Sequence, residues 1–258
     1  MQAFVIWKSV PDTVEELPVR GDGGSLDRET LRFTLGDADE HALEQALLLK
    51  ERHGGKVHLV TLDAPEIDHA IYTALAKGAD TAVKIAIDQT VLGTAAIARV
   101  VASFLTATPG RMTADTLLLP GSQAIDDLEG ELGAFLSEAV ALPYLGVVCG
   151  VTLVGGQVLA TKEFAGGVRG EFEVPLPAVL GIQSAERPPR YVPVAKVRAV
   201  MKSARIDSVE LPVPSPAAAL PVTRMYKPPA TGRAQMIDGS AGDIAVRLAD
   251  ILHERNLI

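Results

Sequence analysis

Cysteine and aromatic residues are scarce in this chain of 258 residues. Cys149 is the only cysteine, so no internal disulfide can form; this suits a reducing compartment and predicts a cytoplasmic location. Aromatic residues make up 4% of the sequence. The core must therefore consist mainly of Ala, Val, Leu and Ile, as in many sheets that are covered by helices.

Long apolar runs and an excess of basic charge are also lacking. No window contains about 18 uninterrupted apolar residues, which argues against a membrane-spanning helix. The formal net charge is −8, and this acidic balance argues against binding to nucleic acid or to a membrane surface. With 48% hydrophobic residues, the composition is that of an ordinary globular protein.

The motifs that carry most enzyme chemistry are missing. There is no HExxH, CxxC, GxSxG or P-loop lysine motif, and the first apolar run is not followed by GxGxxG. No two of the five histidines stand at the spacing expected of metal ligands. We therefore predict no catalytic residue and no metal site, and favour a binding or carrier role over catalysis by side chains.

Short apolar runs alternate with segments of helical periodicity over the first half of the chain. The predicted strands cover residues 3–7, 57–62, 81–87 and 116–119. The predicted helices cover residues 37–53, 65–77, 91–108 and 128–140. Asp37 is predicted to be the N-cap of the first helix, with Glu40 completing a capping box. This alternation predicts an α/β fold with a doubly wound, mostly parallel sheet.

The pattern changes after residue 145. A hairpin is predicted at Gly155 and Gly156, followed by strands at 172–174 and 178–182. Residues 187–229 are rich in proline and poor in periodicity, which predicts an extended arm, and residues 241–257 have the pattern of an amphipathic helix. We therefore divide the chain into an α/β domain, 1–186, and an arm with a terminal helix, 187–258. This helix either folds back on its own domain or embraces a partner subunit.

A polar, glycine-containing loop follows the apolar run that ends at Leu119. It spans residues 121–127, and Gly130 and Gly133 follow it in a segment of helical spacing. Ligands of open α/β sheets bind beyond the carboxyl ends of the strands, where the start of a helix can bind an anion. The loop is therefore a candidate nucleotide site, although an ordinary strand-to-helix connection has the same pattern.

Several segments, in the same order along nearly the whole chain, resemble the beta subunits of electron transfer flavoproteins. The segments lie at residues 5–13, 37–51, 73–80, 121–133, 162–167, 176–179, 189–191 and 201–202. The resemblance implies an adenine nucleotide alpha hydrolase-like α/β fold with an extended C-terminal arm. It also implies a heterodimer with an alpha subunit that largely holds a redox FAD.

The resemblance implies that this subunit binds AMP in a structural role or, in electron-bifurcating members that oxidise NADH, a second FAD. The implied nucleotide contacts are Ile6, Gly36, Asp37, Ala38, Asp39, Leu62, Gly121, Ser122, Gln123, Ala124, Ile125, Asp126, Asp127, Gly130, Glu131 and Leu132. Backbone N–H groups at residues 122–127 and past Gly130 can meet phosphate. Asp126 is expected to cap the loop or to contact ribose, because its charge repels phosphate.

The resemblance also implies sites for partners. Thr13 lies where the family approaches the flavin of the alpha subunit. Residues 190–202 resemble the loop that recognises a flavin-dependent dehydrogenase, such as an acyl-CoA dehydrogenase. The partner-recognition residues that this implies are Arg190, Tyr191, Val194 and Lys202, with Val194 as the apolar anchor.

This chain departs from the family pattern in three places. It has Gly36 where Asn is common and Ala165 where an acidic residue is usual, and the stretch between Tyr191 and Met201 is about three residues longer than the commonest form. An enzyme or nucleotide sensor of the same fold is an alternative. Such enzymes usually carry a Ser-Gly-Gly-rich loop after the first strand, whereas this chain has Val-Pro-Asp-Thr at residues 10–13.

Overall fold

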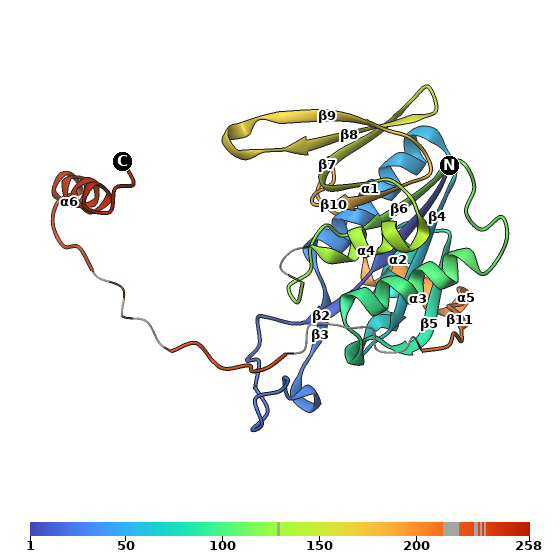
Figure 1. Ribbon diagram of the computed structural model, residues 1–258, viewed down its shortest axis with the longest axis horizontal. Coiled ribbons are helices and arrows are strands. Elements are labelled where there is room, and N and C mark those ends of the chain that lie inside the picture. Colours follow the sequence, from blue (N-terminus) through green and yellow to red (C-terminus); the bar gives the residue numbers. More distant parts are fainter. Residues whose placement is uncertain (128–129, 214–221, 230–231, 233, 235) are drawn as a thin grey trace.

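A nine-stranded sheet forms the centre of the computed structural model, which describes residues 1–127, 130–213, 222–229, 232, 234 and 236–258. The strand order is β11-β5-β4-β1-β6-β10-β7-β8-β9 (Figure 1). β8 runs antiparallel to β7 and β9 runs antiparallel to β8, whereas the other neighbouring pairs are parallel. The predicted α/β fold with a mostly parallel sheet is confirmed.

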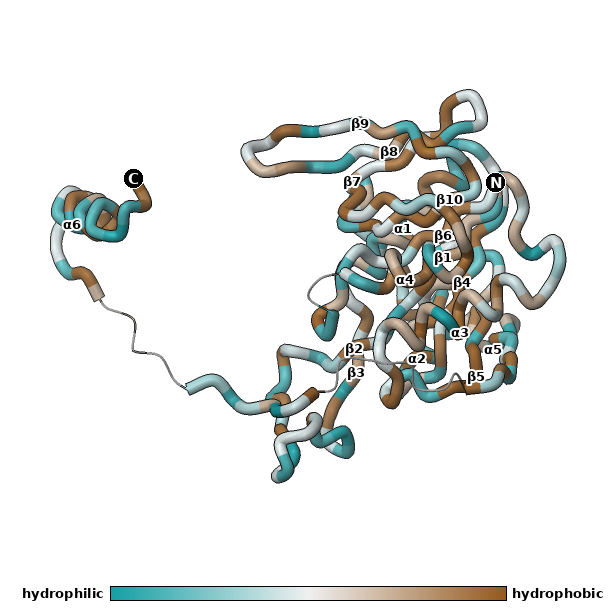
Figure 2. The backbone as a smooth tube through the Cα atoms, in the orientation of Figure 1, coloured by the Kyte–Doolittle hydropathy of each residue, from teal (hydrophilic) through white to brown (hydrophobic). Residues whose placement is uncertain are grey.

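The strands at the centre of this sheet, β1, β4, β6 and β10, are buried on both faces. The strands of the whole sheet are β1 (Gln2–Trp7), β4 (Lys56–Asp63), β5 (Thr81–Asp88), β6 (Thr116–Pro120), β7 (Tyr144–Val154), β8 (Gln157–Glu163), β9 (Arg169–Val174), β10 (Ala178–Ile182) and β11 (Asp207–Val209). A separate antiparallel pair, β2 (Ser9–Pro11) and β3 (Phe33–Leu35), follows β1. In Figure 2, which colours the chain by residue hydropathy, hydrophobic residues are concentrated in the central strands.

Helices cover both faces of the sheet. The main helices are α1 (Asp37–His53), α2 (Ile67–Lys77), α3 (Thr94–Thr106), α4 (Glu131–Val140), α5 (Val194–Ser203) and α6 (Ala241–Glu254). α1 and α2 pack with Val5 and Trp7 on one face, while α3 and α4 pack with Phe4 and Ile6 on the other. Because successive strand residues point to opposite faces, β1 fills both cores by being apolar at every position from Ala3 to Trp7.

Part of the region predicted to be an extended arm folds onto the sheet instead. Residues 194–203 form α5, which lies against α2 and buries Val197. Residues 207–209 form β11, which extends the sheet beside β5. The prediction of an aperiodic extended chain was wrong here, because one buried valine and a three-residue strand are too short to produce a visible period.

The terminal helix was predicted correctly, although it ends at Glu254 rather than at 257. It begins with a capping box, in which Ser240 and Asp243 bond each other's backbone N–H. None of its residues is buried, and it lies apart from the sheet in Figure 1.

Other helices differ from the predictions at their ends. α1 has the predicted bounds but another N-cap, and α2 begins at Ile67 rather than at 65. The N-cap of α1 is Gly36 in an extended conformation, so the predicted capping box at Asp37 is wrong; Asp37 is the first helical residue. α3 begins at Thr94 after a short 3-10 helix, Gln89–Val91, that the sequence pattern does not separate from it. α4 begins at Glu131; the first two residues predicted for it, 128–129, lie outside the described residues.

No helix among the described residues has the length and apolar character needed to cross a membrane.

Candidate functional site

The candidate site lies at the carboxyl ends of β1 and β6, in the middle of the sheet. β1 has β4 on one side and β6 on the other. The chain packs α1 and α2 on one face of the sheet and α3 and α4 on the opposite face. Neighbouring strands whose connections leave toward opposite faces form a crevice beyond their carboxyl ends, and ligands of open α/β sheets bind there.

The loop 121–127 is held in shape by its own backbone amides. Ser122 N–H donates to the Ile182 carbonyl at 2.8 Å, Ala124 N–H donates to the Asp127 carboxylate at 2.6 Å, and Asp127 N–H donates to the Ala124 carbonyl at 3.1 Å. These three amides were predicted to be available for phosphate. They are used within the chain instead, so they shape the loop and do not offer donors to a ligand.

Gly130 brings the start of α4 against this loop. Its φ is +71°, and a Cβ at this position would lie 2.3 Å from the carbonyl oxygen of Ser122. Only glycine fits both the left-handed backbone and this close approach. The first-turn amides of α4, at Glu131, Leu132 and Gly133, have no acceptor within their own helix and lie next to the loop, at the position where an anion is bound in such folds.

The start of α1 closes the other side of the crevice. The indole N–H of Trp7 donates to the Asp39 carbonyl at 2.9 Å, and the Asp39 carboxyl accepts from Gly121 N–H at 3.3 Å. A Cβ on Gly121 would lie 2.8 Å from that carboxyl oxygen. Trp7 and Gly121 therefore fix α1 to the ends of both β1 and β6.

Burial governs the electrostatics of the crevice. Asp39 is 2% exposed, and its desolvation raises the pKa of its carboxyl to about 8, so the group is largely neutral at pH 7. Burial also raises the pKa of Asp127. The ammonium of Lys8 lies 2.6 Å from the Asp126 carboxylate and 3.5 Å from the Asp127 carboxylate, with its side chain 2% exposed.

The structure places most of the predicted nucleotide contacts at this crevice. Ile6 is the second-last residue of β1 and lies beside Pro120 of β6. Leu62 lies near the end of the adjoining β4. The side chains of both residues are fully buried, so they present only main-chain atoms to a ligand. Gln123, Ile125 and Glu131 are exposed, whereas Leu132 packs into the core under α3 and α4.

The predicted partner residues lie outside the crevice. Thr13 is exposed in the turn between β2 and β3. Tyr191 is 83% exposed and Val194 is 59% exposed, at the start of α5, and Lys202 is exposed at its end. Arg190 differs from them, because its guanidinium is bonded to Glu44 and Glu51 of α1.

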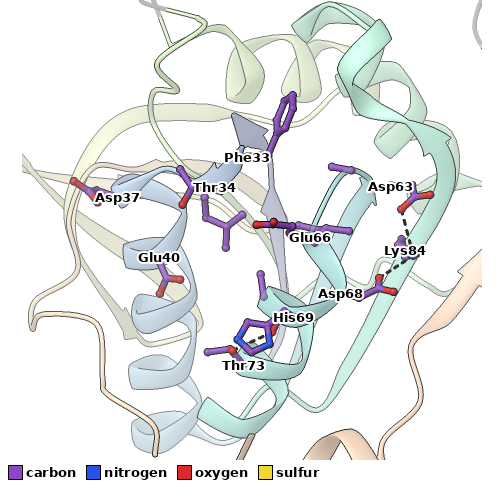
Figure 3. A pocket seen from close by; sticks show the side chains of 14 residues that line it. Phe33, Thr34, Asp37, Glu40, Asp63, Glu66, Asp68, His69, Thr73 and Lys84 are labelled. Atoms are coloured by element: carbon purple, nitrogen blue, oxygen red, sulfur yellow. Dashed lines mark hydrogen bonds and ion pairs between the residues drawn. The ribbon is translucent and has the colours of Figure 1, made fainter. Parts of the chain in front are cut away.

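A cavity of about 820 Å³ lies beside the crevice, between α1 and α2 (Figure 3). Its lining carries five carboxylates, Asp37, Glu40, Asp63, Glu66 and Asp68. Lys84 also lines the cavity, but it is paired with Asp63 at 3.2 Å and with Asp68 at 2.7 Å, as the dashed lines in Figure 3 show. This excess of negative charge repels a phosphate, so the cavity is a poor phosphate site.

Sequence reasoning missed three residues of the site. Lys8, Trp7 and Thr94 were not assigned to it, although Trp7 is the last residue of β1 and Lys8 follows it directly. A lysine and an indole at the end of a strand that is buried on both faces are signals that could have been read, because each must find a polar partner when it is buried. Thr94 comes from the start of α3, and nothing in the sequence connects it with β1.

Among the described residues, no three His, Cys, Asp or Glu side chains are grouped so that they could bind one metal ion.

Comparison with known proteins decides the family. The sequence profile described as electron transfer flavoprotein domain matches residues 24–215. The chain belongs to the electron transfer flavoprotein family. It is 29% identical to the electron transfer flavoprotein subunit beta of Methylophilus methylotrophus, over 98% of both chains. It is 25% identical to the subunit of the same name from Bacillus subtilis, over 98% of this chain and 97% of that one.

A further relative of the electron transfer flavoprotein family is the caffeyl-CoA reductase-Etf complex subunit CarD of Acetobacterium woodii. It is 27% identical and covers 100% of both chains. The similarity therefore extends over α5, β11 and α6 as well as the central sheet.

Proposed function

We propose that this chain is the beta subunit of a heterodimeric electron transfer flavoprotein, and that it serves as an electron carrier subunit rather than as an enzyme. In this role it binds AMP structurally. Its alpha subunit partner holds the FAD that receives electrons from a flavin-dependent dehydrogenase, such as an acyl-CoA dehydrogenase. The main support for this proposal is that the loop 121–127 and the starts of α1 and α4 meet at one crevice. The chain also belongs to the electron transfer flavoprotein family.

The crevice fits an adenine nucleotide in two respects. The first turn of α4 offers amides to the phosphate, and Gly130 allows the loop to lie against that turn. Main-chain atoms at Ile6 and Leu62 are placed at the same sheet edge, where they can bond an adenine edge without a side chain in the way. The other proposed contacts belong to the start of α1 at 36–39, to the loop 121–127 and to the start of α4 at 130–132.

The proposed partner surfaces are exposed side chains at α5 and α6, among the described residues of 187–258. Tyr191 and Val194 are exposed next to α5. In α6, the apolar side chains of Val246, Leu248 and Leu252 are 64%, 48% and 38% exposed. Exposed apolar residues along one helix are typical of a surface that a partner covers. We assign the exposed apolar side chains of α6 to the contact with the alpha subunit.

The nucleotide content of the purified heterodimer tests the proposal. We expect acid extraction to release one FAD and one AMP per heterodimer, measured by chromatography and by the visible flavin spectrum. Two FAD and no AMP would instead favour the alternative of a bifurcating subunit that oxidises NADH. Absence of flavin after co-expression with the alpha subunit would contradict both and favour another nucleotide-binding protein of this fold.

Replacing Val194 with Ala tests the proposed dehydrogenase contact. We expect electron transfer from the dehydrogenase to slow by about five- to tenfold, because an anchor that fills a pocket contributes 1–2 kcal/mol or more to an interface. FAD content should not change, because Val194 is 59% exposed and its truncation leaves no cavity. The matched control is Val154→Ala, which removes an equally exposed valine, also 59%, at the end of β7. Equal transfer rates in both variants would reject Val194 as the anchor.

A further inference from the structure

A buried lysine lies at the base of the candidate nucleotide site. Lys8 follows β1 directly, and its side chain is 2% exposed. Its Nζ lies 3.0 Å from Thr94 Oγ1, 2.6 Å from Asp126 Oδ1 and 3.5 Å from Asp127 Oδ2. These three oxygens come from α3 and from the loop 121–127, so this one ammonium links the end of β1 to both elements.

The loop around Lys8 has the wrong charge for an anion site. Asp126 and Asp127 stand at the end of the loop that precedes α4. Asp127 also has a structural role, because its carboxylate accepts from Ala124 N–H and fixes the turn. A phosphate next to two uncompensated carboxylates would be repelled, so a nucleotide site built from this loop needs a nearby cation.

The partners of Lys8 distinguish two roles that it could have. A lysine ammonium has three N–H donors, and three oxygens already surround this one. It is also almost fully buried beneath the loop, whereas Asp126 is 45% exposed above it. This arrangement is that of a counter-ion to the loop, not of a side chain waiting to contact phosphate.

We propose that Lys8 is a positioning residue of the nucleotide site, whose buried ammonium offsets the negative charge of Asp126 and Asp127 so that the first turn of α4, next to this loop, can bind the phosphate of an adenine nucleotide. The inference rests on the proposed function, and it adds a residue that acts without touching the ligand. It also explains how this chain combines an acidic loop with an anionic ligand.

Charge rescue in the purified heterodimer tests this role. After the bound nucleotide is removed, the dissociation constants of AMP and of adenosine are measured by calorimetry for each variant. Lys8→Met should weaken AMP at least tenfold and adenosine less than threefold, because adenosine has no phosphate for the carboxylates to repel. Adding Asp126→Asn and Asp127→Asn to Lys8→Met should restore AMP to within about threefold of the unmodified protein.

A second variant keeps the test informative if Lys8→Met does not fold. Asp126→Asn removes one partly exposed carboxylate and leaves Lys8 in place, so it should raise the ratio of AMP affinity to adenosine affinity about threefold. The control is Lys50→Met, which breaks the ion pair with Asp80, 2.7 Å long, at the far end of α1. This change should leave the ratio unaltered.

Three results would overturn the inference. The first is unchanged AMP affinity in Lys8→Met. The second is an equal loss of AMP and adenosine affinity, which would mark Lys8 as a structural residue only. The third is failure of the added asparagines to restore AMP, which would mean that Lys8 binds the phosphate directly. By contrast, an unmodified heterodimer that binds neither AMP nor FAD in this subunit would remove the proposed function itself.

Discussion

Replacing Arg190 with Met is expected to destabilise the protein by about 3 kcal/mol, because it leaves a buried carboxylate without its cation. Glu44 is 4% exposed, and its carboxylate receives N–H donors from the Arg190 backbone and from Arg190 Nε and Nη2, at 2.9–3.1 Å. These bonds and a further one to Glu51 raise the pKa of the Arg190 guanidinium above its ordinary value. Thermal unfolding should show a Tm lowered by roughly 6–12 °C.

Two further variants define the cause. Glu44→Met combined with Arg190→Met should recover most of the lost stability, since an apolar pair of similar volume can replace a buried ion pair. Arg169→Met is the matched control. It breaks a pair with Glu163, 2.6 Å long, whose side chains are 70% and 52% exposed, and it should change stability by less than about 0.5 kcal/mol. Equal losses in Arg169→Met and Arg190→Met would show that burial of Glu44 is not the cause.

Replacing Asp39 with Asn is expected to stabilise the protein in a pH-dependent manner. The folded-state pKa of Asp39 is about 8, raised from 3.8 chiefly by burial. Between pH 4 and pH 8 the folded protein therefore keeps a proton that the unfolded chain releases. Asp39 thus reduces stability as the pH rises through this window, by up to about 1.4 kcal/mol per pH unit. Asn cannot ionise, so the variant lacks this loss.

The stability difference between Asp39→Asn and the unmodified protein should be near its minimum at pH 4, grow to about 3 kcal/mol at pH 8, and level off above it. At pH 8 this stability difference is smaller than the free energy that corresponds to the whole shift of the Asp39 pKa, because the buried amide of Asn also has a desolvation cost. Thermal unfolding from pH 4 to pH 9 measures it. Asp37→Asn, an exposed residue two positions earlier on α1, should show no such growth with pH. A constant difference for Asp39→Asn would mean that Asp39 is ionised in the folded protein.

The sequence predicted the parts of the fold that have a strong local period. β1, β4, β5 and β6 were predicted because they are apolar runs bounded by polar turns, and α1 and α2 because they repeat apolar residues and end at a glycine. It missed α5 and β11, since their only support is contact with α2 and β5. It also misplaced the N-cap of α1, because glycine and aspartate are both acceptable caps and only the backbone geometry distinguishes them.

Many of the proposed site residues could be named from the sequence, but their roles could not. Lys8 lay in a segment that resembles the family but was given no role, and Asp39 was named as a nucleotide contact without any sign that it is buried. The structure shows that Lys8 is buried among oxygens and that Asp39 lies under Gly121. Arg190 was assigned to a partner because its segment resembles the family's recognition loop, yet its guanidinium is bonded to a buried carboxylate of its own subunit.

The sequence by itself determined the alternating α/β pattern, the absence of the common catalytic motifs and the family, because these are properties of local spacing and order. The tertiary structure alone decided which charges are buried and what neutralises them. A pKa or an ion pair depends on solvent exposure and on groups far apart in the chain, such as Lys8 and Asp126, which are 118 positions apart but 2.6 Å from each other.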